Sequence, residues 1–452
     1  MDFVPPEILS HIFRITLQAG DVSISSRVGP LLVSQVSQRW RHVAISDSVL
    51  WATFKIDISP TTAAGHSSIV KLWLDRSSCQ PLSITVCMDP FSHMEGSTSK
   101  VMQDIFTVLT SVSTRWKNLN LSLPNYSQKF CLGLCSAHSP ILESLSFKLG
   151  NWSADEASQI NTLLQYAPTL QKLTWSNRSS WASWDSPFDS GIEQLQAPWH
   201  SLTSVCLDTW ITYKSAINIL SYCHSIVHLD LRHFSYGPDT LGQVSSFEGT
   251  LICLLHLESI TIYQLKLDEG LSALLDRLNC PNLKAFHYTC GFVELYTWPQ
   301  SSFHNFLVHS KCSLQALMLE FTGITEPQLT QCLEQSSATL KKLEIYDARG
   351  DICVTDDLLK KMAVHKSVWG KFNGILFPNL ETLILHNVVD CSDGALATTL
   401  RTRSVSYLSR IGAPCNPLHF ARVHFSKRFK VTNKADIEYL DNQMDIMNMN
   451  VL

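Results

Sequence analysis

The sequence predicts an α/β chain in which a short N-terminal helical module precedes an irregular solenoid, a curved parallel sheet with outer helices. Three observations predict this fold. The first fifty residues place apolar side chains at helical spacing. The rest of the chain repeats one apolar pattern at intervals of 24 to 40 residues. A length of 452 residues exceeds one ordinary core, and an architecture that grows by repetition accommodates it.

The first helix is expected directly after Pro5 and Pro6. Proline suits a first helical turn because the N–H groups there have no acceptor within the helix, and Glu7 favours the positive end of the helix dipole. The apolar side chains that follow form one stripe, at Ile8, Leu9, Ile12 and Phe13.

A second helical pattern follows a Ser- and Gly-rich loop at residues 20–30. Its apolar residues recur every three to four positions, at Leu32, Val36, Trp40 and Val43. So few helices make a small core, and part of this apolar surface needs a partner or the rest of the chain to cover it.

Three blocks in this region, Val4–Phe13, Leu31–Ala44 and Leu50–Trp51, follow one another as in the F-box domain, which the segment resembles. The resemblance implies a three-helix module over residues 1–51 that binds the Skp adaptor and, through it, a cullin-RING ubiquitin ligase. Trp40 and Trp51 are expected to be structural. By position, the adaptor-binding residues are Pro5, Glu7, Ile8, Leu9, Ile12, Leu32 and Val36.

Two features depart from the usual F-box pattern. Val4 stands where the family usually has Leu, and the loop before Leu31 is longer than in many members, a trait shared with fungal F-box-like sequences. On helical spacing alone, the segment also fits a helical cap on the end of a solenoid, and the two roles are compatible.

The repeated pattern is an apolar residue followed at +3 and +5 by two more. It resembles the leucine-rich repeat of the helix-bearing type, whose stacked units bury each other's apolar faces. The ninth position lacks the usual Asn or Cys that bonds the turning backbone, so an irregular solenoid is expected over residues 116–430. An ordinary doubly wound α/β domain is the alternative. Units start at Trp116, Leu142, Leu170, Leu202, Ile226, Leu257, Leu283, Leu314, Leu340, Leu380 and Phe420.

Two flanking segments complete the expected organisation. Residues 52–115 are a connecting segment with divergent first repeats at 54–58 and 82–86, and residues 431–452 are a C-terminal capping helix or tail. From Arg401 to Lys434 there are eight Lys or Arg and no acid, which fits binding of an acidic substrate motif or a phosphodegron, weak nuclear targeting through residues 427–430, or a solvated face.

Strand residues between the apolar positions should line the concave surface, because successive side chains point to opposite faces. A protein substrate of unknown identity is expected there, and a solvated face that binds nothing is the alternative. Residues 178–200 indicate an aromatic loop that either anchors a partner or folds back on the repeats. The candidate substrate-binding residues are Asp230, Arg232, Tyr263, His287, Met318, Glu320, Glu344, Tyr346 and His386, with Ile384 beside them, and Trp181 and Trp184 in the loop.

Other classes of function lack support in the sequence. Fingerprints of nucleotide-binding and hydrolytic enzymes are absent, so no enzyme and no cofactor is expected. A net charge of −4 makes nucleic acid an improbable partner. The cluster Cys131, Cys135 and His138 lacks a fourth ligand for a metal, and the scattered cysteines fit reduced thiols.

The composition also bears on location. With no basic leader and no apolar run of about 18 residues, the chain is expected in the cytoplasm, the nucleus or both, away from membranes. The expected function is that of the substrate-recognition subunit of a Skp–cullin–F-box ubiquitin ligase. A repeat scaffold for protein–protein interaction without ligase association is the alternative.

Overall fold

The structure is a computed structural model of the chain. It divides into two compact units, Met1–Ile211 and Thr212–Leu452, which are treated separately below. The residues that it describes are 4–17, 22–25, 27–59, 66–88, 96–123, 128–134, 137–149, 153–177, 192–235, 251–264, 269–291, 298–347, 352–366, 372, 376–425 and 433–442.

The N-terminal helices surround a small apolar core. They are α1 (Pro6–Leu17), α2 (Gly29–Val36) and α3 (Gln38–Ser46), followed by the short 3-10 helix η1 (Ser48–Trp51). Phe13, Val43 and Trp51 are buried. The Trp51 indole donates a hydrogen bond to the Ala44 carbonyl at 2.7 Å, and its ring meets Trp73 edge-on at 5.1 Å. The first expected helix is α1, whereas the second apolar pattern, Leu32 to Val43, is divided between α2 and α3, because Ser37 has an extended backbone and its side chain caps α3. Trp51 joins these helices to the first repeat.

The loop before α2 is fixed by one glycine and one strand. Gly29 has φ +65°, and a Cβ there would collide with the Val22 side chain. Lys55 N donates to Val22 O at 2.8 Å, and Ile24 N donates to Lys55 O at 3.0 Å. Glycine is therefore required at this position, because the backbone is left-handed and the neighbouring chain is close.

The first unit continues as alternating strands and helices. Every registered strand pair in it is parallel, and consecutive strands lie side by side. Its strands are β1 (Thr53–Ile58), β2 (Leu82–Met88), β3 (Trp116–Ser122), β4 (Ser144–Leu149), β5 (Lys172–Asn177) and β6 (Ser204–Thr212). Its outer helices are α4 (His66–Arg76), α5 (Gly96–Thr110), α6 (Gln128–Leu132), α7 (Ala154–Gln159) and α8 (Asn161–Gln165), with 3-10 helices η2 (Ser113–Arg115) and η3 (Ile192–Gln194).

The second unit has the same arrangement. Its main strands are β7 (His228–Ser235), β9 (Ser259–Gln264), β11 (Ala285–Cys290), β12 (Ala316–Glu320), β13 (Lys342–Tyr346), β14 (Thr382–His386) and β15 (Phe420–His424), and β8 (Ile252–Cys253) pairs with β10 (Leu278–Asn279). Its helices are α9 (Tyr213–Tyr222), α10 (Gly270–Leu275), α11 (Gln300–Ser310), α12 (Glu326–Gln335), α13 (Asp356–Met362), α14 (Ala395–Thr402), α15 (Val405–Ile411) and α16 (Lys434–Asn442).

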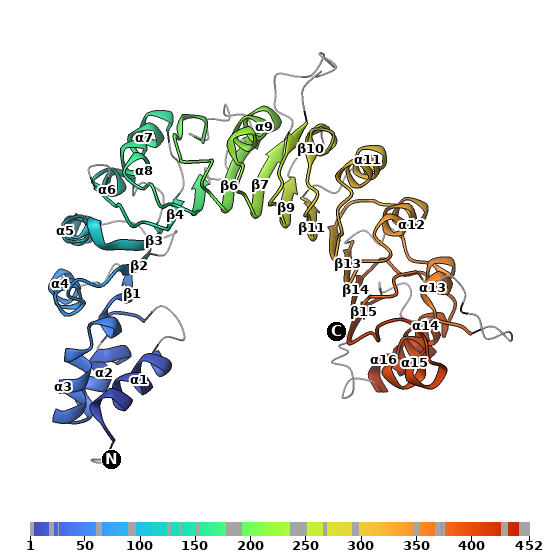
Figure 1. Cartoon of the computed structure of the whole chain (residues 1–452), viewed down its shortest axis with the longest axis horizontal. Coiled ribbons are helices and arrows are strands. Elements are labelled where there is room, and N and C mark those ends of the chain that lie inside the picture. The colour runs from blue at the N-terminus through green and yellow to red at the C-terminus, as the bar shows by residue number, and fades with distance from the viewer. Residues whose placement is uncertain are drawn as a thin grey trace. The chain divides into compact units, whose positions relative to one another are not determined.

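Within each unit the helices lie on one side of the row of strands (Figure 1). The strand order follows the chain order, without the reversal that marks a doubly wound sheet. The predicted fold class, N-terminal helices followed by parallel strands with outer helices, is confirmed, and the doubly wound alternative is wrong. The alternating segments at 54–58 and 82–86 are the strands β1 and β2.

The apolar pattern builds the core because its members meet in register. Position +3 of one unit pairs with position +3 of the next, as Leu317 does with Leu343, and these side chains are buried. The last unit corrects the expectation. Leu383 pairs with Ala421, so this unit starts at the buried Leu418 rather than at the half-buried Phe420. A shift by two residues keeps the same face, which is why periodicity alone misplaced the start.

Side chains from the following unit link successive repeats before the strands. The residue just before a unit's first leucine donates its hydroxyl to the carbonyl of the preceding unit's first leucine. Thr169 reaches Leu142 O at 3.0 Å, Ser201 reaches Leu170 O at 3.1 Å, and Thr339 reaches Leu314 O at 2.7 Å. These links satisfy buried carbonyls that would otherwise be costly to leave without a donor.

The end of the second unit is closed by α16. Its buried Asp436 carboxylate accepts hydrogen bonds from Gly394 N at 3.0 Å and Ala397 N at 2.7 Å, at the start of α14. A carboxylate is stabilising there because the first helical N–H groups lack intrahelical acceptors. Leu440 is buried in the same helix. Residues 434–442 thus form the expected helix, and Met444 and Met447 lie outside the described residues.

Candidate protein-docking surfaces

The first candidate surface is the apolar side of α1 and α2, which pack against each other. Ile8 is 51% exposed, Ile12 44%, Leu32 46% and Val36 59%. Such a group of large apolar side chains on one small module marks an interaction site more often than chance exposure. We call these four residues the apolar helical surface.

The other predicted adaptor-binding residues divide into two kinds. Pro5 and Glu7 are exposed. Leu9 is 3% exposed, so it belongs to the core of the helices. A change at Leu9 therefore disturbs folding before it disturbs a surface. Spacing could not separate Leu9 from Ile8, because neighbouring residues on one stripe point about 100° apart around the helix.

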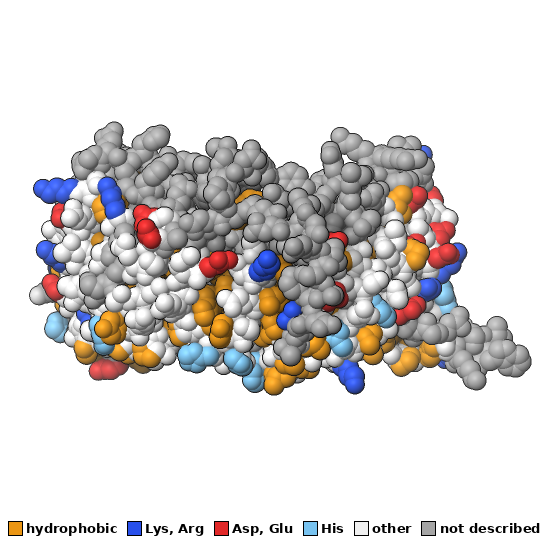
Figure 2. All heavy atoms as spheres, turned by 90° about the horizontal axis from the view of Figure 1, so that it is seen from above, with side chains coloured by type: hydrophobic (Ala, Val, Ile, Leu, Met, Phe, Trp, Pro, Cys, Tyr) orange, Lys and Arg blue, Asp and Glu red, His pale blue; other side chains and the backbone are white. Residues whose placement is uncertain are grey.

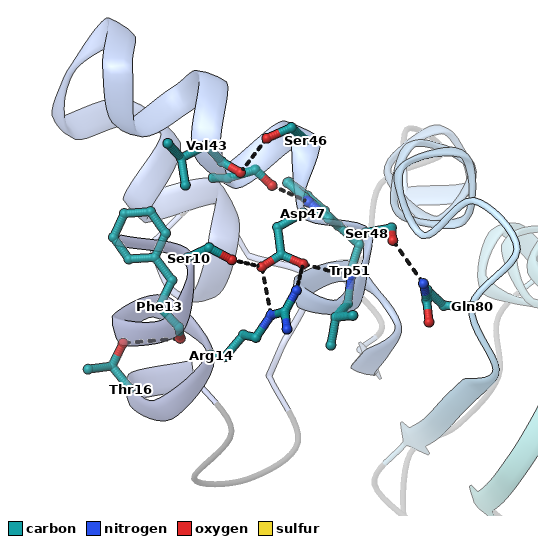
Figure 3. A network of polar contacts seen from close by, with 12 residues as sticks. Ser10, Phe13, Arg14, Thr16, Val43, Ser46, Asp47, Ser48, Trp51 and Gln80 are labelled. Carbon is teal, nitrogen blue, oxygen red and sulfur yellow. Dashed lines mark hydrogen bonds and ion pairs between the residues drawn. The ribbon is translucent and has the colours of Figure 1, made fainter. Parts of the chain in front are cut away.

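A polar network inside the module fixes α1 against η1 (Figure 3). The buried Asp47 carboxylate accepts two hydrogen bonds from the Arg14 guanidinium, both at 2.8 Å, and another from the Ser10 hydroxyl. It also accepts from Val49 N at 3.2 Å at the start of η1. Paired hydrogen bonds between Arg and a carboxylate define geometry as well as energy, so this network holds the angle at which α1 presents Ile8 and Ile12.

The electrostatics of Asp47 follow from this network. Burial raises the pKa of the Asp47 carboxyl, but the hydrogen bonds from Arg14 and Ser10 outweigh burial and hold its pKa below the usual range. The same pairing raises the pKa of Arg14. Both groups therefore stay charged near neutral pH, and the network is intact there.

The second candidate surface is the strand face of the second unit that points away from the helices. It consists of two rows of side chains that lie in register across β7, β9, β11, β12, β13, β14 and β15. The first row is Asp230, Thr261, His287, Met318, Glu344, Ile384 and Arg422, and the second is Arg232, Tyr263, Thr289, Glu320, Tyr346, His386 and His424.

All nine strand residues proposed as substrate-binding lie in these two rows, and they come from six strands, β7, β9 and β11 to β14. Their accessibility differs. Glu344 is 5% exposed, and Ile384 in the same row is 9% exposed, so both offer little surface to a partner. The Lys342 ammonium lies 2.5 Å from the Glu344 carboxylate and compensates its charge.

Sequence reasoning missed four members of the rows, namely Thr261, Thr289, Arg422 and His424. The two threonines lie at the same strand positions as the predicted residues, but the prediction named only larger or charged side chains. Arg422 was missed because the last unit was started at Phe420, and the buried Leu418 was the signal that would have found it, whereas His424 lies on this face with either start.

Hydrogen bonds and ring contacts connect the rows internally. Thr289 donates to Glu320 at 2.9 Å and lies 3.1 Å from His287 Nε2. Burial lowers the pKa of His287, although Glu320 and Glu344 act to raise it, so the imidazole is mainly neutral at neutral pH. The middle of the face is therefore acidic and already hydrogen-bonded.

The remaining predicted sites are partly outside the described residues. Trp181, Trp184 and residues 427–430 of the basic segment fall there. Within the described part of that segment, Arg403 is 2% exposed and donates to Phe377 O at 2.6 Å, and Arg401 lies over the Tyr439 ring at 5.3 Å. Arg403 is therefore structural and unavailable to a partner, whereas Arg401 is exposed, so the segment is not one continuous basic docking patch.

Charge is not concentrated on the face shown in Figure 2, where Lys, Arg, Asp and Glu side chains are scattered singly among uncharged ones. Within the described ranges, no three His, Cys, Asp or Glu side chains come together so that they could hold a metal ion, and Cys135 lies outside them. Burial raises the pKa of the Cys223 thiol to about 12 and of the Cys332 thiol to about 11. These thiols stay protonated and weakly nucleophilic.

None of the helices in the described part of the chain combines the length and the apolar character needed to cross a bilayer.

Comparison with known proteins gives a fold-level likeness alone. No family model matches the chain, and no curated protein matches it in sequence. Among solved structures, the crystal structure of the Rad7–Elc1 complex from yeast is similar, with a TM-score of 0.43 and 16% identity over 85% of this chain and 89% of that chain. A likeness this distant carries no inference about function, which has to rest on the residues themselves.

Proposed function

We propose that this protein is a substrate-recognition subunit of a Skp–cullin ubiquitin ligase, acting in the cytoplasm, the nucleus or both. In this proposal α1 and α2 dock on the Skp adaptor, and the strand face of the second unit binds a protein substrate. The chain itself supplies no catalytic group. Its contribution is proximity, which converts an encounter between substrate and ligase into an effectively intramolecular one.

The observation that carries the proposal is the apolar helical surface within the F-box-like blocks. Its four large apolar side chains are exposed, as is Ile15 of α1 at 61%, while the module has a core of its own. At about 25 cal/mol per Å² of apolar area, covering them would favour association with another apolar surface. The Asp47 network supports this role because it fixes α1 before any partner arrives.

The test is co-purification of the full chain with a Skp adaptor. The variant Ile8→Asp/Ile12→Asp places two charges on exposed positions and should abolish co-purification. Ile45→Asp is a matched control, because Ile45 is also 40% exposed but lies on α3, outside the proposed contact. It should bind normally. Adaptor binding that is absent in the wild type, or unchanged in the double variant, would instead favour the scaffold without a ligase.

A further inference from the structure

Arg422 differs from the other charged residues of the strand face because its guanidinium has no partner. It lies in the middle of β15, the last strand of the second unit. Its Nε is buried without a hydrogen-bond partner, and no residue of the described chain forms an ion pair with it. The guanidinium makes a cation–π contact with the Phe420 ring, whose centroid is 5.4 Å away.

Basic side chains elsewhere on or behind this face are engaged. Arg232 pairs with Asp230 at 2.9 Å, Lys342 pairs with Glu344, and Arg403 donates to main-chain carbonyls. Arg403 also has one buried nitrogen, Nη1, without an acceptor, but its Nη2 is hydrogen-bonded, whereas the Arg422 guanidinium makes no hydrogen bond and no ion pair within the described chain and can therefore bind a ligand's acceptor.

A ladder of rings runs beside Arg422 in the second row. Tyr346 and His386 stack with centroids 5.7 Å apart and an interplanar angle of 26°, and His386 and His424 stack at 4.5 Å and 24°. Rings stacked between neighbouring strands turn their edges to solvent. The Tyr346 hydroxyl already donates to Glu344 at 3.4 Å, but ring edges carry the positive part of the quadrupole, so this ladder favours an anion beside it.

We propose that Arg422, together with the edges of Tyr346, His386 and His424, is a docking site for an acidic peptide segment of a protein partner. An Asp or Glu carboxylate of the segment accepts hydrogen bonds from the two Nη groups of Arg422, the fork geometry that suits a carboxylate. The inference deepens the proposed function, because this segment would belong to the substrate.

The charge around the site selects a carboxylate over a phosphate. Arg422 supplies one full positive charge, and Glu320 and Glu344 lie on β12 and β13, the two strands before β14. A dianionic phosphate would meet more repulsion from these acids than a monoanionic carboxylate does. Burial of the partner's carboxylate is offset by the unpaired guanidinium, whose own desolvation has already occurred.

The experiment selects short peptides from a random display library on the immobilised full-length protein. Each selected peptide is then remade with Asp→Asn or Glu→Gln at its acidic positions, and separately with phosphoserine there, and binding is measured by fluorescence anisotropy. The acidic form should bind the wild type at least about 10-fold more tightly than the amide form, the loss expected for charge-assisted hydrogen bonds.

Three protein variants complete the test. Arg422→Gln should lose the preference for the acidic peptide. Arg422→Lys keeps the charge but loses the fork, so it should weaken the preference. If Arg422→Gln lowers Tm, Arg422→Lys becomes the deciding variant. Lys360→Gln should leave the preference unchanged, because Lys360 is an exposed residue of helix α13, outside the strand face. The inference is overturned if no peptide is selected, if the acid and amide forms bind alike, if phosphoserine is required, or if both Arg422 variants bind as the wild type does.

Adaptor co-purification separates this inference from the proposed function. Arg422→Gln should still co-purify with the adaptor, because Arg422 lies in the second unit and the apolar helical surface in the first. Acid-dependent peptide binding in a protein that never binds the adaptor would support the peptide site and overturn the ligase role. Adaptor binding without acid-dependent peptide binding would do the reverse.

Discussion

The N-terminal helices and the strand face of the second unit distribute apolar and polar side chains in opposite ways. In α1 and α2, large apolar side chains are exposed while the Asp47 network is buried. In the second unit the apolar ladder is buried, and polar and aromatic side chains face outward. Repeats cover their apolar faces by stacking on each other, whereas three helices cannot cover all of theirs. The helices are thus suited to a permanent apolar partner and the strands to a polar one.

The largest expected effect comes from neighbouring residues on α1. Leu9→Ala should lower the free energy of unfolding by about 2–5 kcal/mol, because it leaves a cavity in the core. Ile8→Ala should change it by less than about 0.5 kcal/mol and yet weaken adaptor binding. Urea denaturation and adaptor pull-down of the two variants check this. Equal loss of stability in both would falsify the division of α1 into a core side and a docking side.

Leu9 and Ile8 also show how much of the fold and of the docking surface the sequence predicts. Apolar spacing at 3.6 residues placed α1 and identified its stripe, and the +3 and +5 pattern placed strands whose pairing the structure confirms at Leu317 and Leu343. Spacing did not tell which members of the stripe on α1 face the core. That choice depends on where α3 and η1 pack, and these contacts lie more than thirty residues away along the chain.

The Asp47 network should make the stability of the module depend on pH. The pKa of Asp47 is lowered in the folded state, so its contribution is fully present above the ordinary Asp pKa of about 4 and is lost as pH falls through the folded value. Asp47→Asn should cost about 1–2 kcal/mol at pH 7 and progressively less toward pH 3. Urea unfolding of both proteins across this range measures the difference.

A control for Asp47 lies on the neighbouring strand. Asp57 pairs with Lys55 at 2.8 Å, but its side chain is 50% exposed. Asp57→Asn should therefore change the free energy of unfolding by less than about 0.5 kcal/mol at any pH in the range. A cost for Asp47→Asn that stays constant between pH 7 and pH 3 would mean that packing, and not the ion pair, holds α1 against η1.

The hydroxyl–carbonyl hydrogen bonds between repeats could not be predicted from the sequence for a related reason. The ninth position suggested that the backbone after each strand lacks the usual ladder, whereas Thr169, Ser201 and Thr339 link the repeats at another place, the carbonyl of the first leucine. A hydroxyl before a leucine is common in any chain. It becomes a link only when the next strand is in register, and register is a property of the assembled sheet.

The smallest expected effect tests these links directly. Thr339→Val keeps the shape and removes the hydroxyl that donates to Leu314 O, which should cost about 0.5–1.5 kcal/mol. Thr398→Val is the control, because the exposed Thr398 hydroxyl bonds only within its own helix, to Gly394 O at 2.7 Å. Hydrogen exchange of the Lys342 amide, which donates to Gln315 O across the same pair of repeats, reports the opening. Faster exchange in Thr339→Val alone means that the hydroxyl joins the two repeats. Equal exchange in both variants means that apolar stacking alone holds the two repeats together. The repeats would then resemble the proposed contact between the N-terminal helices and their partner, which also consists of apolar contacts.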